Sequence, residues 1–222
     1  MPVPVATRRP VAGLLGLFAP SRCLACRRRA EPPWCRVCAD RVSPLPAGCA
    51  RCAAPPGGLH RCWAPGAPVD ATVAALDYRG VVARAVVTAK VTGAHAGWRA
   101  LGEVLAERVV AAGVDADVVT WVTTASPRRR RRGVDHAELL ARTVAGATSL
   151  PVLRLLEAAP CRDGSDRYRA VTALPGSDVL LVDDVVTTGG TARRAATALR
   201  SAGAGSVRLA VIARAGTHDL GS

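Results

Sequence analysis

The stretch that most constrains the fold is VLLVDDVVTTGGT, residues Val179 to Thr191. Its four apolar residues predict a buried strand that ends at two adjacent acids, Asp183 and Asp184. Small residues then lead into a helix that begins at Thr191, so the amides of the loop and of the helix N-terminus can hold an anion. The stretch suits a ligand that carries both hydroxyls and a phosphate. A merely solvated strand end would explain the acids but not the Thr-Gly run.

The sequence around this stretch alternates between strand and helix patterns. Apolar runs predict strands at 70–78, 117–123, 178–184 and 206–214. Apolar residues at a spacing near 3.6 predict helices at 81–91, 96–113, 135–146 and 191–203. This alternation implies an α/β fold in which helices cover both faces of a parallel sheet. Ligands bind such sheets at the carboxyl ends of the strands, where the loop after Asp184 lies.

Four cysteines near the start are spaced C-x2-C-x8-C-x2-C, at Cys23, Cys26, Cys35 and Cys38. Two residues between thiols let one tight turn present both sulfurs to a single ion, as in zinc ribbons. The alternative is a secreted module stapled by disulfides, but a disulfide across C-x2-C is strained. We therefore expect structural zinc at these four residues.

A second cysteine set is less complete. Cys49 and Cys52 repeat the C-x2-C spacing, but only Cys62 follows, and His60 is the nearest substitute for a fourth ligand. The alternatives are a second zinc ion and a degenerate ribbon that packs without metal. Either way, residues 21–68 are rich in Pro and Gly and have too little apolar sequence for a core, so metal binding would supply the folding energy. The module boundary is expected near Pro68, and Cys161 is interpreted as an ordinary small side chain.

The N-terminal segment, residues 1–20, resembles a signal peptide but lacks a small-residue cleavage site, and its apolar run is too short to span a bilayer. We expect it to be a short amphipathic helix, with the chain in the cytoplasm and no stable membrane span. The formal net charge is +13, from 29 arginines and one lysine against 17 acids. This charge is typical of proteins that contact nucleic acid, but the preference for arginine also fits a GC-rich coding bias.

Residues 179–191 match the phosphoribosyl pyrophosphate fingerprint of type I phosphoribosyltransferases: four apolar residues, two acids, two apolar residues, then Thr-Thr-Gly-Gly-Thr. With the cysteine-rich leader, ALDYRG…AK and SPRRRRRGVDHAELLA, the chain resembles the ComF family, which is associated with competence and DNA uptake. The resemblance implies a zinc-ribbon leader and, over 69–222, a phosphoribosyltransferase-like parallel sheet of about five strands. It also implies a site for phosphoribosyl pyrophosphate with Mg²⁺, in which Asp183 and Asp184 hold the ribose hydroxyls. The residues assigned to the ligand's phosphate and its loop are Val185, Val186, Thr187, Thr188, Gly189, Gly190 and Thr191.

Three further features are expected near this ligand. Lys90 is the only lysine, which favours a site that needs a compact ammonium, although a single lysine can also arise by chance. The resemblance places a pyrophosphate loop after the strand at 117–123; we assign Ser126 to the ligand and Arg132 to stabilising the departing pyrophosphate. The alternative for this arginine run is a solvated loop or one that contacts nucleic-acid backbone.

Two helix-start residues and one polar segment complete the expectations. Asp135 is interpreted as a helix N-cap and His136 as a surface residue. Residues 161–171 are predicted to form a mobile flap; they lack the Asn that the family pattern has here, which bears more on catalysis than on ligand binding.

Two functions follow from these patterns. The first is a phosphoribosyl transfer to an acceptor that the sequence does not identify, with catalysis by positioning and electrostatics. The second is a non-catalytic zinc-ribbon protein that handles single-stranded DNA or serves as an adaptor in DNA uptake, with a vestigial or regulatory sugar-phosphate site.

Overall fold

The computed structural model describes residues 21–46, 48–56, 62–63, 66–93, 95–124, 135–161 and 166–216. The N-terminal segment and the arginine run therefore lie outside the described residues. No helix in the described ranges is long and apolar enough to cross a membrane.

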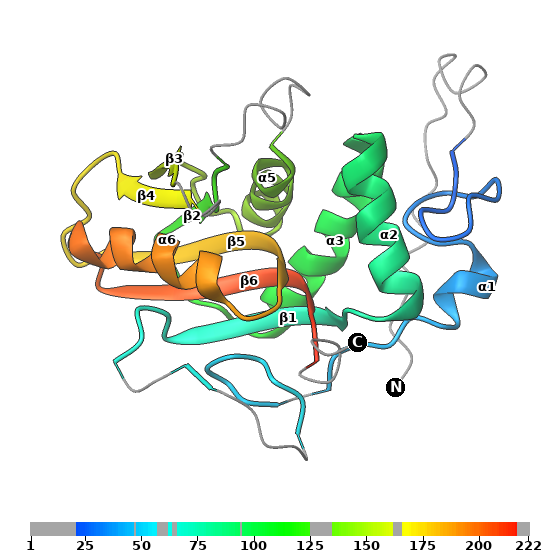
Figure 1. The fold of residues 1–222 in the computed structure, drawn as a ribbon, viewed down its shortest axis with the longest axis horizontal. Helices are drawn as coiled ribbons and strands as arrows, with labels where there is room; N and C mark the ends of the chain where they lie inside the picture. The colour runs from blue at the N-terminus through cyan, green and yellow to red at the C-terminus, as the bar shows by residue number, and fades with distance from the viewer. Residues whose placement is uncertain are drawn as a thin grey trace.

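The centre of the fold is a parallel sheet, as predicted (Figure 1). It contains β1 (Ala71–Asp77), β6 (Ser206–Arg214), β5 (Asp178–Val186) and β2 (Val118–Trp121) in that order, and each neighbouring pair is parallel. All four carboxyl ends consequently lie along one edge. Strand β5 sits inside the sheet, which explains why its sequence is continuously apolar rather than alternating.

The two faces of the sheet bury separate cores. Successive side chains of β5 alternate: Leu180 and Val182 join the core under α2 (Gly80–Thr92), α3 (His95–Ala111) and α5 (His136–Thr148). Val179 and Leu181 join the core under α6 (Gly190–Ser201) on the other face. Helices thus cover both faces, which confirms the predicted fold class (Figure 1).

A β-hairpin occupies part of the segment that the sequence indicated as a flap. Strands β3 (Leu156–Pro160) and β4 (Asp166–Ala170) pair in antiparallel fashion, and β4 packs on α6. The Glu157 and Arg169 side chains form an ion pair across the two strands, at 2.6 Å. The hairpin escaped prediction because neither strand, LEAAP or DRYRA, shows a clear apolar alternation, and β-structure depends more on pairing than on local propensity.

The parallel sheet has four strands in the described ranges, rather than the five that the family resemblance implied. Val152 lies beside Val119 but makes only an isolated parallel bridge. The amide of Val119 donates to the carbonyl of Pro151, and that of Leu153 donates to Val119. Pro151 has no amide hydrogen to extend the ladder, so the pairing stops there.

The cysteine-rich region packs on the sheet domain at two places. The first cysteine set surrounds α1 (Arg36–Ala39) and contacts Val81 of α2, and Leu24 lies against Gly97 of α3. The second set follows a segment that runs beside β1, where the amide of Leu45 donates to Ala75. The two sets therefore contact different parts of the molecule.

Candidate functional site

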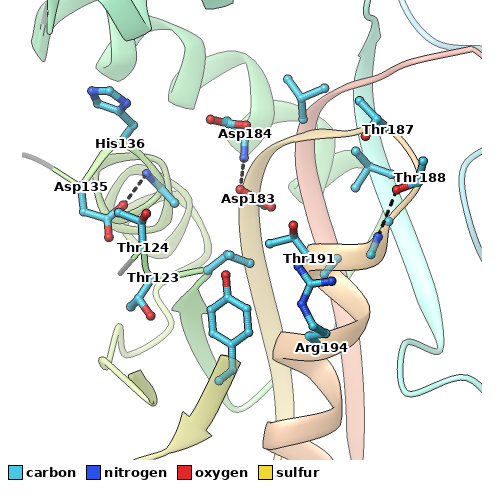
Figure 2. Close-up of a pocket in the computed structure, with 18 of the residues that line it drawn as sticks. Thr123, Thr124, Asp135, His136, Asp183, Asp184, Thr187, Thr188, Thr191 and Arg194 are labelled. Atoms are coloured by element: carbon cyan, nitrogen blue, oxygen red, sulfur yellow. Dashed lines mark hydrogen bonds between the residues drawn. The ribbon is translucent and has the colours of Figure 1, made fainter. Parts of the chain in front are cut away.

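A cavity of about 320 Å³ lies at the carboxyl edge of the parallel sheet (Figure 2). Its wall is built mainly from the ends of β2 and β5, the start of α5, the first turn of α6, and β4 of the hairpin. Every residue from Asp183 to Ala192 lines it. The other lining residues are Lys90, Val122, Thr123, Thr124, Asp135, His136, Ala137, Tyr168 and Arg194.

Asp183 and Asp184 lie within the last residues of β5, because the strand continues to Val186 instead of ending at the acids. The amide of Asp184 donates to Oδ1 of Asp183 at 2.8 Å. The carboxylate of Asp184, whose side chain is 15% exposed, pairs with the ammonium of Lys90 at 2.8 Å. The lysine reaches this position from the last turn of α2, so the single lysine of the chain meets one of the two acids inside the cavity.

The two acids have different surroundings. Burial, together with the negative charge of Asp184, raises the pKa of Asp183 to about 8. The nearby charge of Lys90 acts in the opposite direction but does not offset the burial. In the ligand-free protein Asp183 is consequently a neutral carboxyl group at neutral pH, beside a paired Asp184.

This arrangement predicts a pH dependence of stability in the ligand-free protein. Between the usual aspartate pKa near 4 and the folded value near 8, the folded state holds a proton that the unfolded chain releases, so stability falls as the pH rises through this window. Asp183→Asn keeps the acceptor oxygen and removes the titration. Urea unfolding from pH 5.5 to 8.5 should show the wild type losing stability relative to this variant. A constant difference between the two would contradict the prediction.

The loop after β5 is fixed by a left-handed glycine. Gly189 has φ 76° and precedes α6, which begins one residue earlier than predicted. A Cβ atom placed on Gly189 would lie 2.8 Å from Nε1 of Trp63, so the tryptophan ring and the loop backbone are in contact. Gly189 has no side chain to cap the helix, and the amide of Gly190 makes a long hydrogen bond, 3.5 Å, to Oγ1 of Thr188. An anion can therefore compete for the first-turn amides of α6.

The opposite wall begins at helix α5. Asp135 accepts a hydrogen bond from the amide of Ala137 at 3.2 Å, so the predicted N-cap is confirmed, and it also lines the cavity. The expectation that His136 is a surface residue was wrong. Its ring stacks on Trp98, with centroids 4.6 Å apart and planes 15° apart, and it lines the cavity. The sequence could not predict this position for His136, because its stacking partner, Trp98, is remote in sequence.

Tyr168 and Arg194 complete the cavity and were missing from the predicted site. Tyr168 belongs to β4 and lines the cavity. Arg194 belongs to the first turns of α6 (Figure 2). Both also line a second, adjoining groove of about 480 Å³ between β4 and α6. An arginine on the exposed side of an amphipathic helix has no distinctive sequence signal, and the tyrosine could be placed only once the hairpin was known.

The two cysteine sets each bring their sulfurs together. Cys23, Cys26, Cys35 and Cys38 offer sulfurs that lie within 4.8 Å of one another, and so do Cys49, Cys52 and Cys62. Zinc–thiolate bonds of about 2.3 Å in a tetrahedron hold sulfurs about 3.8 Å apart. The pairs Cys26–Cys35 at 3.6 Å and Cys49–Cys62 at 3.5 Å fit this spacing. Both clusters could therefore bind zinc.

Thiol chemistry in the first cluster also suits a cation. Burial raises the pKa of the Cys23 thiol, but hydrogen bonds from the amides of Cys26, Cys35 and Ala25 outweigh it and lower the pKa to about 6. Burial raises the pKa of the Cys38 thiol to about 12, so this thiol keeps its proton at neutral pH when no cation is bound. Metal binding would release the remaining thiol protons.

Three predicted site residues, His60, Ser126 and Arg132, lie outside the described residues.

Residues 72–220, more than half of the chain, match the family described as phosphoribosyl transferase domain. No curated protein matches the chain. Among solved structures, the allosteric regulatory enzyme of purine biosynthesis is 28% identical over 53% of this chain and 25% of its own, with a TM-score of 0.40.

Two further solved structures are similar. The glutamine phosphoribosylpyrophosphate amidotransferase of B. subtilis is 29% identical over 52% of this chain and 26% of its own, with a TM-score of 0.39. The purine phosphoribosyltransferase of Pyrococcus horikoshii is 18% identical over 51% of this chain and 70% of its own, with a TM-score of 0.37. The chain thus spans about a quarter of the length of the first two enzymes.

Proposed function

The chain belongs to the phosphoribosyltransferase domain family, and on that premise we propose that it binds phosphoribosyl pyrophosphate with Mg²⁺ and transfers the phosphoribosyl group to an acceptor. The observation that carries this proposal is the cavity wall, in which the whole stretch from Asp183 to Ala192 surrounds one space. A ribose 5-phosphate needs hydroxyl acceptors and phosphate donors within a few ångströms, and this stretch offers both.

Each part of the wall has a role in the proposal. Asp183 and Asp184 accept hydrogen bonds from the ribose hydroxyls, and the side chains and amides from Thr187 to Thr191 donate to the 5′-phosphate. Lys90 holds the Asp184 carboxylate in place through their ion pair. Mg²⁺, which domains of this family typically use with phosphoribosyl pyrophosphate, would neutralise charge on the ligand's pyrophosphate near these carboxylates.

The transfer needs no covalent enzyme intermediate. The acceptor forms a bond to the anomeric carbon while the bond from that carbon to the pyrophosphate oxygen breaks, and the electron pair leaves with pyrophosphate. Ser126 and Arg132 are assigned to the departing pyrophosphate. Tyr168, on the hairpin side of the cavity, limits the access of water to the reacting carbon.

We extend the proposal to the type of protein. The cysteine-rich leader and the fingerprint together support a ComF-type protein of the cytoplasm, where thiols remain reduced. In this assignment residues 1–20 are an N-terminal segment, 21–68 a zinc-ribbon-like module, and 69–222 the phosphoribosyltransferase-like domain. Zinc in the two clusters is structural, with His60 as the candidate fourth ligand of the second.

A second candidate function is the handling of single-stranded DNA. It is favoured by the groove between β4 and α6, which is lined by Arg167, Arg169 and Arg194 and adjoins the cavity at Tyr168. A cationic groove beside an aromatic ring is the usual arrangement for binding a single strand through its phosphates and one stacked base. Here the sugar-phosphate site would be regulatory or vestigial.

Isothermal titration with phosphoribosyl pyrophosphate tests the first proposal. The wild type should bind the ligand only when Mg²⁺ is present. At pH 8.5, above the pKa of about 8 of Asp183, the variant Asp183→Asn/Asp184→Asn, which preserves side-chain shape, should bind at least about a hundredfold more weakly. Each charged hydrogen bond contributes about 1.5–3 kcal/mol. Wild-type protein that shows no Mg²⁺-dependent heat would overturn the proposal.

A matched titration with a single-stranded oligonucleotide separates the two candidates. Under the second function, affinity for the oligonucleotide falls steeply with salt and is unchanged in the double aspartate variant. Arg167→Gln/Arg169→Gln should then weaken it. If the oligonucleotide does not bind at low salt, the DNA-handling function is wrong.

A further inference from the structure

Arg214, the last residue of β6, is a buried cation whose guanidinium donates to several backbone carbonyl groups. It is 5% exposed. Its Nη1 donates to Val186 at 3.2 Å, to Thr187, and to Ala215 at 3.2 Å. Its Nε donates to the carbonyl of Cys52 at 3.1 Å. One guanidinium therefore joins the start of the phosphate loop, here residues 186–189, to the second cysteine cluster, Cys49, Cys52 and Cys62.

The electrostatics agree with this geometry. Burial lowers the pKa of Arg214, and its interaction with the Cys52 side chain raises it. A guanidinium that is removed from water costs free energy unless its donors are satisfied, and here carbonyl groups from the loop and from the cysteine cluster satisfy them. If either group moves, a buried charge is left with fewer acceptors, so the two segments are coupled energetically.

Trp63 makes a second link between the same two segments. It follows Cys62 directly in sequence, is 4% exposed, and packs against the backbone of Gly189. The second cluster is thus linked to the loop at two points. Arg214 joins the carbonyl of Cys52 to the start of the loop, and Trp63, the residue after Cys62, contacts the end of the loop at Gly189. A shared ion would fix Cys62 relative to Cys52, and with it Trp63 relative to Arg214.

The first cluster provides the contrast. Its buried sulfurs, Cys23 and Cys38, pack with Val81 near the start of α2. Lys90 lies nine residues further along the same helix, a separation of about 13 Å at 1.5 Å per residue. The contacts of the first cluster therefore lead to helices α2 and α3 instead of to the phosphate loop.

We propose that the second cysteine cluster is a metal-dependent support for the phosphate loop, and that Arg214 and Trp63 are the positioning residues that connect them. Metal bound by the three thiols holds the carbonyl of Cys52 and the ring of Trp63 where they fix residues 186–189. Loss of the metal loosens the loop and weakens binding of the ligand's phosphate. The binding part of this inference rests on the proposed function; the metal-to-loop part does not.

The test compares the two clusters by equivalent substitutions. Cys62→Ser removes a thiol of the second cluster, and Cys26→Ser removes an exposed thiol of the first. For each folded variant three quantities are measured: zinc per chain, amide hydrogen exchange of residues 185–191, and affinity for phosphoribosyl pyrophosphate with Mg²⁺. Exchange of residues 179–182 in the same strand serves as the internal reference.

We expect each variant to lose its own zinc, but only Cys62→Ser to accelerate exchange in 185–191, by at least about tenfold, and to lose at least about tenfold in affinity. Cys62→Ser that loses zinc without changing loop exchange overturns the inference. If wild-type protein does not bind the ligand, the proposed function fails, and the exchange measurement still decides the metal-to-loop link.

Arg214→Lys tests the connection with the cluster intact, and it decides the matter if Cys62→Ser fails to fold. Lysine keeps the charge but lacks the planar fork that reaches both segments. This variant should retain zinc and yet show the accelerated loop exchange and weakened affinity of Cys62→Ser. Trp63→Phe, which keeps an aromatic ring beside Gly189, should retain most of the wild-type loop protection. Wild-type exchange in Arg214→Lys would show that the arginine does not position the loop.

Discussion

Gly189→Ala is expected to weaken binding of phosphoribosyl pyrophosphate severely while the protein remains folded. The residue has φ 76°, a conformation that costs an alanine about 1–2 kcal/mol. The new Cβ would also lie 2.8 Å from Nε1 of Trp63, which is buried and cannot move aside. The loop must therefore shift, and the amides that we assign to the phosphate shift with it. We expect an affinity loss of at least about a hundredfold, measured by titration calorimetry.

Gly113→Ala is the matched control. Gly113 also has a positive φ, 58°, but a Cβ atom added to it would meet nothing within 4 Å, and it follows α3 away from the cavity. It should lose about 1 kcal/mol of stability and keep full affinity. Equal affinity loss in both variants would mean that the contact between Gly189 and Trp63 has no role in binding.

Cys23→Ser should produce the largest loss of stability. Cys23 is fully buried in the first cluster, and serine is a poor ligand for zinc. Because zinc supplies much of the folding energy of such modules, we expect about one zinc ion fewer per chain and a destabilisation of about 3 kcal/mol or more. This corresponds to a fall in Tm of about 10 °C for a chain of this size. Metal analysis and differential scanning calorimetry provide the measurements.

Cys161→Ser is the control for this second prediction. Cys161 is half-buried, stands outside both clusters and receives the identical chemical change. It should leave zinc content and Tm unchanged. A similar fall in Tm for both variants, or full zinc retention in Cys23→Ser, would contradict a metal-supported fold.

The sequence predicted the parallel sheet and its helices well, because each element carries its own periodic pattern. The predicted ends of the strands and helices were less accurate. Strand β5 continues through Val185 and Val186 because these residues pair with Ala213 and Arg214, which are remote in sequence. No local pattern records that pairing. The hairpin β3–β4 was missed for the same reason, since its two short segments become strands only when paired with each other and packed on α6.

The residues of the site likewise fall into those that a local sequence pattern revealed and those that only the folded structure revealed. The stretch from Asp183 to Thr191 was found because one continuous run of sequence contains all of its chemistry. Arg214 and Trp63 could not be found, because among 29 arginines a buried one is recognised only by the carbonyl groups around it. The pairing of Lys90 with Asp184 was likewise hidden, although the isolation of the lysine in the composition was a usable signal.

The ion pair between Lys90 and Asp184 has a practical consequence. This chain contains one side-chain amine, and the structure places it in the cavity wall. Lys90 is therefore the one lysine that an amine-selective acylating reagent can modify, and mass spectrometry identifies the product. Protection of Lys90 from acylation counts occupied sites without an attached fluorophore or affinity tag, which allows candidate ligands and acceptors to be screened on the unaltered sequence.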